Sequence, residues 1–518
     1  MSRRIPLELA EDNGGSMYVS ERKVYPREVS GRLNTLRVAA VFWLLGMFYV
    51  FPWLRWDDRQ AVLFDLPARK FHVFSLTFWP QDFLFLALLL IIAALALFFF
   101  TALAGRLFCG YACPQTVWTE VFLWMEQWTE GDRNKRMKLD AGPWNSEKVL
   151  RKGAKHALWL VFALWTGFTF VGFFTPIGDL AARLPRLEWG GWETFWVLFY
   201  ALATWGNAGF LREQVCKYMC PYARFQSAMF DRNTLIIAYD PMRGEPRGPR
   251  KRGLGSIAAR GRALLDQITA YDYVFRSALH PTAADNRVQA AGTITLGEAG
   301  QVAEPLPKFA PDELGDCIDC TMCVQVCPTG IDIRNGLQYE CIACGACIDA
   351  CDSVMDKMGF ERGLIRYSTQ NAIDSKPTRV LRARVLIYGV VLVALVIAWV
   401  VGVNTRSPLI VEVLRDRNAL YRVVGGGQVE NDYTLKVVNK SDDAATYRIT
   451  IDGAAPGIEL RGGGLDSVPA AAQQVISVPV VVTAPDSLTG RQPLQFRVET
   501  VDGGTSETVD SSFFGPIQ

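Results

Sequence analysis

Eight of the twelve cysteines form two copies of one spacing, separated by a short loop. The copies are Cys317-x2-Cys320-x2-Cys323-x3-Cys327-Pro328 and Cys341-x2-Cys344-x2-Cys347-x3-Cys351. This spacing is typical of a bacterial domain with two [4Fe–4S] clusters, in which the fourth cysteine of each run ligates the cluster held by the other run. The region is therefore predicted to fold around iron and to carry electrons.

The crossed pattern assigns the cysteines to two sets of ligands. The first cluster is predicted on Cys317, Cys320, Cys323 and Cys351, and the second on Cys341, Cys344, Cys347 and Cys327. Zinc or disulfides are the alternative interpretation. A zinc site needs four ligands and has no use for a crossed fourth cysteine, so two clusters are the favoured prediction.

Long apolar segments predict a membrane protein. Each of five segments has the length and composition needed to cross the hydrocarbon of a bilayer. They are Val38–Leu54, Phe83–Ala104, Ala157–Pro176, Trp192–Leu211 and Val385–Val403. Buried helices of a soluble protein are the alternative, but those are usually shorter and carry more charges. The stretch Ala61–Pro80 is apolar but broken by charged residues, so it is interpreted as interfacial.

The distribution of Lys and Arg predicts the orientation. The tail 1–37 and the loop after Phe83–Ala104 are rich in both residues, whereas the loop between the third and fourth spans has only Arg183 and Arg186. The positive-inside rule places the tail, the basic loop and the cluster region in the cytoplasm, and the C-terminal domain outside. All twelve cysteines then lie on the reducing side or at its membrane boundary, as expected for thiols that must stay reduced.

The remaining four cysteines form a second repeat. Cys109-Gly-Tyr-Ala-Cys113-Pro114 follows the second span, and Cys216-Lys-Tyr-Met-Cys220-Pro221 follows the fourth, each a few residues after an arginine, Arg106 or Arg212. Positions i and i+4 share one face of a helix, so each pair offers two thiolates to one site. Thiolates favour Cu(I) or iron–sulfur clusters. Unligated core cysteines are the alternative.

The chain after Val403 changes to short alternating segments. Tyr433–Val438 and Tyr447–Ile451 are predicted to pair as a hairpin with a longer loop, and further strands are expected at Gln474–Val482 and Leu494–Thr500. An immunoglobulin-like sandwich that serves for docking is the resulting prediction for residues 404–518.

The domain organisation follows from these segments. We predict a multi-domain membrane protein with a cytoplasmic tail at 1–37, a four-span α-helical region at 38–211, a basic cytoplasmic linker at 212–311, the ferredoxin domain at 312–360, a linker at 361–384, the last span at 385–403 and the periplasmic sandwich at 404–518. Arginines between Arg243 and Arg262 are expected to contact anionic lipid rather than nucleic acid. Thr116–Trp128 is expected to be an interfacial helix.

Other cofactor classes are excluded by absent motifs. The three histidines include none in the middle of a predicted span, so a haem held by two histidines is not expected. No dinucleotide fingerprint and no P-loop occur. Electrons must therefore come from a partner or from quinol.

Taken together, these motifs resemble the FixG/CcoG (RdxA) family of cytochrome c oxidase accessory proteins, over the whole chain and in the same order. The first half also resembles NapH-type membrane ferredoxins, which share the CxxxCP motif. The FixG/CcoG resemblance implies a bacterial inner-membrane protein that reduces Cu(II) to Cu(I) during assembly of cbb3-type oxidase. Copper ions, oxidase assembly factors or copper chaperones, an unidentified electron donor and membrane lipid are then the expected partners. It also implies that the eight ferredoxin cysteines ligate two [4Fe–4S] clusters, and that Cys109, Cys113, Cys216 and Cys220 hold copper or a third cluster. Asp352 departs from the pattern, because it stands where a second proline would follow Cys351.

Two other functions remain open from the sequence. One is a NapH-like conduit that passes electrons from quinol to an external reductase. The other is a non-catalytic scaffold that holds copper for assembly.

Overall fold

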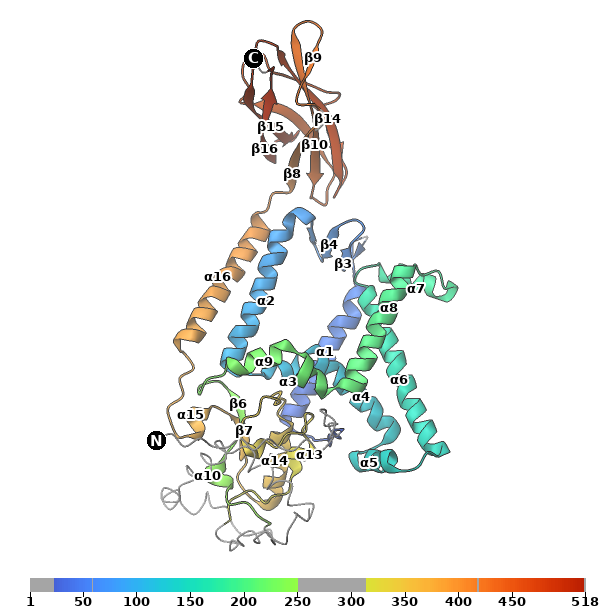
Figure 1. Ribbon diagram of the computed structural model, residues 1–518, viewed down its shortest axis with the longest axis vertical. Helices are drawn as coiled ribbons and strands as arrows, with labels where there is room; N and C mark the ends of the chain where they lie inside the picture. The colour runs from blue at the N-terminus through green and yellow to red at the C-terminus, as the bar shows by residue number, and fades with distance from the viewer. Residues whose placement is uncertain (1–22, 58, 250–313, 417–418, 517–518) are drawn as a thin grey trace, which may run out of the picture. The chain divides into compact units, whose positions relative to one another are not determined.

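The computed structural model describes residues 23–57, 59–249, 314–416 and 419–516. The chain divides into two compact units, Met1–Leu395 and Val396–Gln518, and helix α16 (Ala383–Thr405) contains the boundary. The first unit contains all twelve cysteines. The second continues from the end of α16 into strands (Figure 1).

Within the described ranges, four helices are long and apolar enough to cross a membrane. They are α1 (Arg32–Val50, continued by the 3-10 turn Phe51–Trp53), α2 (Phe83–Ala104, preceded by the 3-10 turn Pro80–Asp82), α6 (Ser146–Val171) and α16. On α2, Leu84, Leu86 and Leu90 are each more than half exposed. A continuous apolar surface of this kind is rare on soluble monomers and suits contact with lipid.

The fourth predicted span, Trp192–Leu211, differs from the other four. Helix α8 (Gly191–Thr204) covers only its first part, and the π-helix η4 (Trp205–Leu211) completes it. The wider turn is closed by a hydrogen bond from the Arg212 N–H to the Asn207 carbonyl, 2.7 Å long. A side chain at Gly167 of α6 would collide with the backbone of α8, so this glycine permits the close approach of the two helices.

Small elements connect the helices. Residues 55–78 form short strands: β1 (Arg55–Trp56) pairs with β2 (Arg59–Gln60), and β3 (Val62–Asp65), β4 (Lys70–Val73) and β5 (Leu76–Phe78) form an antiparallel sheet. The stretch interpreted as interfacial is therefore a small sheet. The buried Gln60 amide joins it to the end of α6, because Nε2 donates to the Gly172 carbonyl at 2.7 Å. After α6 follow α7 (Ile177–Arg183) and a 3-10 turn, Leu184–Arg186.

The elements that carry the CxxxCP motifs are short helices. The first motif lies on α3 (Leu107–Tyr111) and leads into α4 (Pro114–Glu130) and α5 (Arg133–Ala141). The second lies on the π-helical turn η5 (Val215–Met219) and leads into α9 (Pro221–Ala228). The predicted helix Thr116–Trp128 is confirmed as part of α4; its place at a membrane interface stays a prediction.

The ferredoxin cysteines lie in a small α/β region. Its helical elements are α13 (Met322–Gln325), the 3-10 turn η8 (Ile333–Asn335) and α14 (Ala346–Met358). Strand β6 (Ile236–Tyr239) pairs antiparallel with β7 (Ile365–Ser368), and both pack into the same core as the cysteines. Two short helices, α10 (Pro241–Gly244) and α15 (Gln370–Ile373), follow the strands.

These two strands lie outside the range 312–360 that the cysteine spacing suggested. Arg243, expected at lipid, forms an ion pair with the buried Asp316 at 2.6 Å. Residues 250–262, which hold most of the predicted basic stretch, lie outside the described residues.

The second unit is a sandwich of two antiparallel sheets. One sheet has the order β12-β14-β10-β8 with β9 beside β10, and the other has the order β13-β11-β15-β16. The strands are β8 (Leu409–Arg415), β9 (Arg422–Val424), β10 (Gln428–Asn439), β11 (Ala445–Asp452), β12 (Glu459–Arg461), β13 (Val468–Ala470), β14 (Val475–Pro485), β15 (Arg491–Thr500) and β16 (Ser506–Phe514). Leu435 and Val480 from one sheet and Phe496 and Phe513 from the other share one buried core.

The predicted hairpin in this domain is wrong. Its two strands correspond to β10 and β11, which belong to different sheets. Alternation identified the core-facing residues of each strand but not its partner. The connection crosses between the sheets and is held by the buried Asn439, whose Nδ2 donates to the Asp443 and Ala471 carbonyls at 2.8 and 3.0 Å.

Candidate metal centres

The first predicted ligand set gathers at one cavity. Cys317, Cys320, Cys323 and Cys351 all line it, together with apolar side chains that include Met355. Cys351, the last cysteine of the second run, lies on α14, so the crossed cysteine reaches the first set. Of the twelve cysteines, all of which are described, Cys320 alone is exposed. This cavity therefore has one ligand position at the protein surface.

The second predicted ligand set gathers at a neighbouring cavity. Cys327, Cys341, Cys344 and Cys347 line it, as does Cys323 from the first set. Cys347 and Cys323 also interact electrostatically. The two cavities thus adjoin, which suits electron exchange between the groups they would hold.

The two cysteine loops repeat each other in backbone conformation. Asp319 and Ala343 both have φ of 53°, two residues after the first cysteine of each run. This conformation is costly for residues other than glycine. It turns the N–H groups of Asp319 and Ala343 toward the sulfurs of Cys317 and Cys341, respectively. Strain retained in both loops is consistent with a ligand that needs those N–H groups.

The chemistry of the buried thiols fits iron ligation. Burial raises the pKa of Cys323 and of Cys341 to about 12, so at neutral pH these groups are neutral thiols until a metal displaces their protons. Within the described ranges, no three His, Cys, Asp or Glu side chains stand close enough to hold a single ion. A four-iron cluster does not require that closeness, because each cysteine binds a different iron.

The four CxxxCP cysteines also converge, although more than a hundred residues separate the motifs. Cys109 interacts electrostatically with Cys113, Cys216 and Cys220, and Cys216 interacts with Cys113 and Cys220. Burial, with the neighbouring thiols, raises the pKa of Cys109 to about 12 and that of Cys216 to about 11. The site is thus a half-buried group of four thiols.

Each motif places its second cysteine at the start of a helix. Cys113 precedes Pro114 of α4, and Cys220 precedes Pro221 of α9. In both motifs the N–H of this cysteine bonds to the carbonyl five residues earlier, at 2.9 Å to Phe108 and 2.8 Å to Val215. Turns of this width are frequent at functional sites. Both helix N-termini favour negative charge at the thiols.

Residues that sequence reasoning missed support this site. The Cys109 thiol donates to Gln226 Oε1 at 3.3 Å, and the Thr116 hydroxyl donates to the Cys109 carbonyl at 2.6 Å. Gln226 is fully buried. Its place in α9, six residues after Cys220, carries no distinctive pattern.

A buried ionic network holds the second motif. Glu126 of α4 is fully buried and pairs with Arg212 at 2.7 Å and with Arg136 at 3.3 Å. Burial would raise the pKa of Glu126, but Arg212, Lys23 and Arg136 outweigh burial and lower it. Two acidic residues one turn apart on the buried face of α4, Glu126 and Glu130, are the sequence signal that could have identified this network.

The first motif touches the loop of the second ferredoxin set. A Cβ on Gly110 would lie 2.8 Å from the Ile342 carbonyl oxygen and 2.9 Å from the Cys344 Cα. Tyr111 lies beside Tyr367, with hydroxyl oxygens 3.4 Å apart, and the Tyr367 hydroxyl donates to the Ala343 carbonyl at 2.6 Å. The backbone of the CxxxCP turn therefore packs directly on the Cys341–Cys347 loop.

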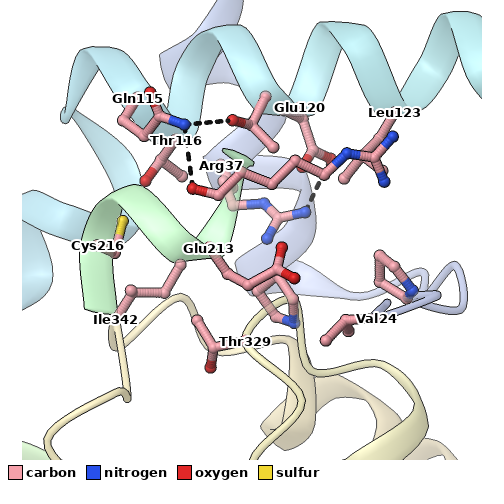
Figure 2. Close-up of a pocket in the computed structure, with 14 residues that line it drawn as sticks. Val24, Arg37, Gln115, Thr116, Glu120, Leu123, Glu213, Cys216, Thr329 and Ile342 are labelled. Carbon is pink, nitrogen blue, oxygen red and sulfur yellow. Dashed lines mark hydrogen bonds and ion pairs between the residues drawn. The ribbon is translucent and has the colours of Figure 1, made fainter. Parts of the chain in front are cut away.

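A pocket lies beside the second motif. Figure 2 shows Cys216 and Glu213 at one side, Arg37 and Glu120 of α1 and α4 at another, and Thr329 and Ile342 from the ferredoxin loops below. Arg37 pairs with Glu120 at 2.8 Å. Cys216 lines this pocket, so the second motif can be reached through it.

Comparisons with known proteins agree with this architecture. The family described as "IG-like fold at C-terminal of FixG" matches residues 399–516. A 4Fe-4S dicluster domain family matches residues 211–265 and 292–370, which include β6 and β7, and a 4Fe-4S binding domain family matches residues 86–136, which include Cys109 and Cys113.

Relatives cover most of the chain. Nitrogen fixation protein FixG of Rhizobium meliloti is 36% identical over 487 residues, which are 87% of this chain and 83% of that protein. Proteins RdxB and RdxA of Cereibacter sphaeroides are each 36% identical over 96% of this chain and 98% of their own lengths. The crystal structure of a FixG-related protein from Vibrio parahaemolyticus is 29% identical, covers 21% of this chain and 98% of that chain, and has a TM-score of 0.19.

Proposed function

Because the chain belongs to the FixG/RdxA family, we propose that it is a membrane-bound cupric reductase whose CxxxCP thiols receive electrons from its ferredoxin domain. Iron–sulfur domains, apolar helices and an Ig-like domain make it a membrane iron–sulfur electron-transfer protein. The observation that carries the finer proposal is the direct packing of the first CxxxCP turn on the Cys341–Cys347 loop.

The ferredoxin thiols would hold two [4Fe–4S] clusters in the crossed arrangement. Such clusters supply single electrons at potentials set by nearby charge and hydrogen bonds. The arrangement predicts that Cys351→Ser removes the cluster on Cys317, Cys320 and Cys323, with a loss of about four irons. Electron paramagnetic resonance that instead shows loss of the Cys341 cluster would contradict the assignment.

The CxxxCP thiols would bind copper as substrate. Each Cu(II) takes one electron and becomes Cu(I), which thiolates hold better than Cu(II). Two thiolates are enough for Cu(I), so one cysteine from each motif could bind the ion, and each motif would supply only half of the site. The pocket beside Cys216 and Glu213 offers a route for the cation.

The experiment is a copper-dependent reoxidation. Anaerobically purified protein is reduced, freed of reductant and mixed with Cu(II), and cluster bleaching and chelated Cu(I) are followed together. We expect one Cu(I) per electron in the wild type. The Cys109→Ser/Cys113→Ser variant should keep reducible ferredoxin clusters and form no Cu(I). A normal rate in that variant would contradict the proposal.

A second candidate function is a conduit in which the CxxxCP thiols hold a third cluster. The match of residues 86–136 to a 4Fe-4S binding domain favours it. Iron quantitation separates the two: about eight irons leave the thiols free for copper, and about twelve fill them with a cluster. A conduit also predicts quinol-dependent reduction of the clusters without copper. A copper-holding scaffold predicts binding without turnover.

The cellular setting is also a proposal. We place the protein in the bacterial inner membrane, with the ferredoxin domain in the cytoplasm and the Ig-like domain in the periplasm, where it would meet oxidase assembly factors or copper chaperones. An export-dependent reporter should be active when fused after Gln518 and silent when fused near Pro311. The reverse pattern would contradict this orientation.

A further inference from the structure

Arg106 occupies an unusual position between two groups of cysteines. Its side chain is 4% exposed. Nη2 donates to the Ala223 carbonyl, and Nη1 faces the Cys341 carbonyl oxygen at 3.5 Å. The guanidinium also lies over the ring of Phe230, 5.9 Å from its centroid. The cation is thus buried where the CxxxCP turn meets the ferredoxin loop.

The electrostatic neighbours of Arg106 come from all three cysteine segments that meet there. They are Cys109 of the first CxxxCP motif, Cys216 of the second and Cys341 of the second ferredoxin run, followed by Glu340. Among the described residues, Arg106 Nε has no hydrogen-bond partner. A buried cation without a close counter-charge is costly. Thiols that become thiolates when they bind metal would supply that counter-charge.

The equivalent arginine of the second repeat has a different partner. Arg212 is also buried, but it forms an ion pair with Glu126 at 2.7 Å. At the first ferredoxin set the cation is Arg334, which acts on Cys323 and pairs with Asp332 at 2.6 Å and with Asp319. Of these three arginines, Arg212 and Arg334 form ion pairs with carboxylates, and Arg106 is the one that faces cysteines without such a pair among the described residues.

We propose that Arg106 is a shared counter-cation that couples the Cys341 cluster electrostatically to the CxxxCP thiols. Its charge stabilises the reduced, more negative form of that cluster and therefore raises its reduction potential. The same charge, three residues before Cys109 and buried at this contact, would stabilise the metal-bound form of the CxxxCP site. The Cys341 cluster is then the one adjacent to the CxxxCP site, and the cluster with the exposed Cys320 is the remote one, where electrons arrive. The CxxxCP part of this inference rests on the proposed function.

The test measures the midpoint potential of each cluster in the full-length protein by potentiometric titration with electron paramagnetic resonance. Cys351→Ser identifies the signal of the remote cluster. Arg106→Gln should lower the midpoint potential of the Cys341 cluster by at least about 59 mV, which is a tenfold change in its one-electron equilibrium constant. The potential of the remote cluster should not change. In Arg106→Lys, which keeps the charge, the potential of the Cys341 cluster should shift by less than that amount. The exposed Arg362→Gln is the matched control and should shift neither potential.

A second measurement tests whether the charge of Arg106 also acts on the CxxxCP site. In the Gln variant, a Cu(I) chelator should remove copper from the CxxxCP site at a lower concentration than in the wild type, and in the Lys variant at an unchanged concentration. Equal potentials in the wild type and the Gln variant, equal shifts of both clusters, or unchanged chelator competition would overturn the inference. If the Gln variant loses iron, the Lys variant decides: retained iron at the original potential supports a role through charge, and loss of the Cys341 cluster there as well contradicts it.

The potential shift does not depend on copper. If it appears while Cu(II) fails to reoxidise the wild-type clusters, the role of Arg106 at the cluster stands and the reductase proposal fails. If copper is reduced normally and the potential does not shift, the reductase proposal stands and the role of Arg106 fails.

Discussion

The two CxxxCP repeats share their sequence pattern but not their surroundings. The first packs its Gly110 backbone on the ferredoxin loop, and its Tyr111 lies beside Tyr367. The second exposes Tyr218 by 57% and places Cys216 beside a pocket. Under the proposed function, the first repeat would receive electrons from the ferredoxin loop that it contacts, and the second would meet copper through its pocket. We propose that the duplicated motif supplies two halves of one site with different tasks.

The largest effect that we expect is a loss of stability when the ionic network beside the second repeat is removed. Glu126→Gln leaves the buried Arg212 and Arg136 without their carboxylate, and loss of one partner of a buried pair costs about 3 kcal/mol or more. Thermal unfolding in detergent should show this loss. The control is Glu147→Gln on α6, whose ion pair with Arg151 is exposed and contributes little. Equal stability of the two variants would show that the network does not hold the second repeat.

The next largest effect is a slower reoxidation by copper when the first repeat is changed. Gly110→Ala forces its new methyl group against the Ile342 and Ala343 carbonyls and separates the CxxxCP turn from the ferredoxin loop. Misplacement of reacting groups by about 1 Å can slow a reaction on the order of 10²-fold, so we expect copper-dependent reoxidation to slow by about tenfold with iron content unchanged. Stopped-flow absorbance measures the rate.

Gly153→Ala is the matched control for that variant. Gly153 also lies in a helix, but a Cβ there meets nothing within 4 Å. Reoxidation in this variant should match the wild type. If the Gly110 variant is equally fast, the contact with the ferredoxin loop does not carry the electrons.

The smallest effect distinguishes the two tyrosines of the shared pattern. Tyr111→Phe removes a part-buried hydroxyl contact to Tyr367 and should cost about 0.5–1 kcal/mol. Tyr218→Phe changes an exposed side chain and should change the unfolding free energy by less. Chemical denaturation of the two variants gives the comparison. A larger loss from Tyr218→Phe would reverse the assignment of the two repeats.

Sequence reasoning worked where the information is local. The crossed ligand sets follow from spacings within 35 residues, and the structure brings both sets to adjoining cavities. Core-facing residues of β10, β14 and β15 follow from alternation within each strand. The convergence of the two CxxxCP motifs follows from repetition together with the alternating direction of spans.

The features that the sequence did not predict correctly depend on partners that are distant in the chain. The sequence predicts a linker over 212–311 and gives no sign of β6, because the partner strand β7 is more than 120 residues away. The β10–β11 hairpin was wrong because adjacency in sequence does not decide which sheet a strand joins. The roles of Glu126, Gln226 and Arg106 depend on burial and neighbours that no local pattern encodes.

The central claim is that the two repeats form one site. Its most direct measurement is copper-dependent reoxidation in three variants: Cys109→Ser/Cys113→Ser, Cys216→Ser/Cys220→Ser, and all four changes together. Residues that act as one unit are not additive. We predict that either double variant loses Cu(I) formation as completely as the quadruple variant, while the ferredoxin clusters stay reducible. Partial activity in each double variant, lost only when all four cysteines are replaced, would contradict a single shared site.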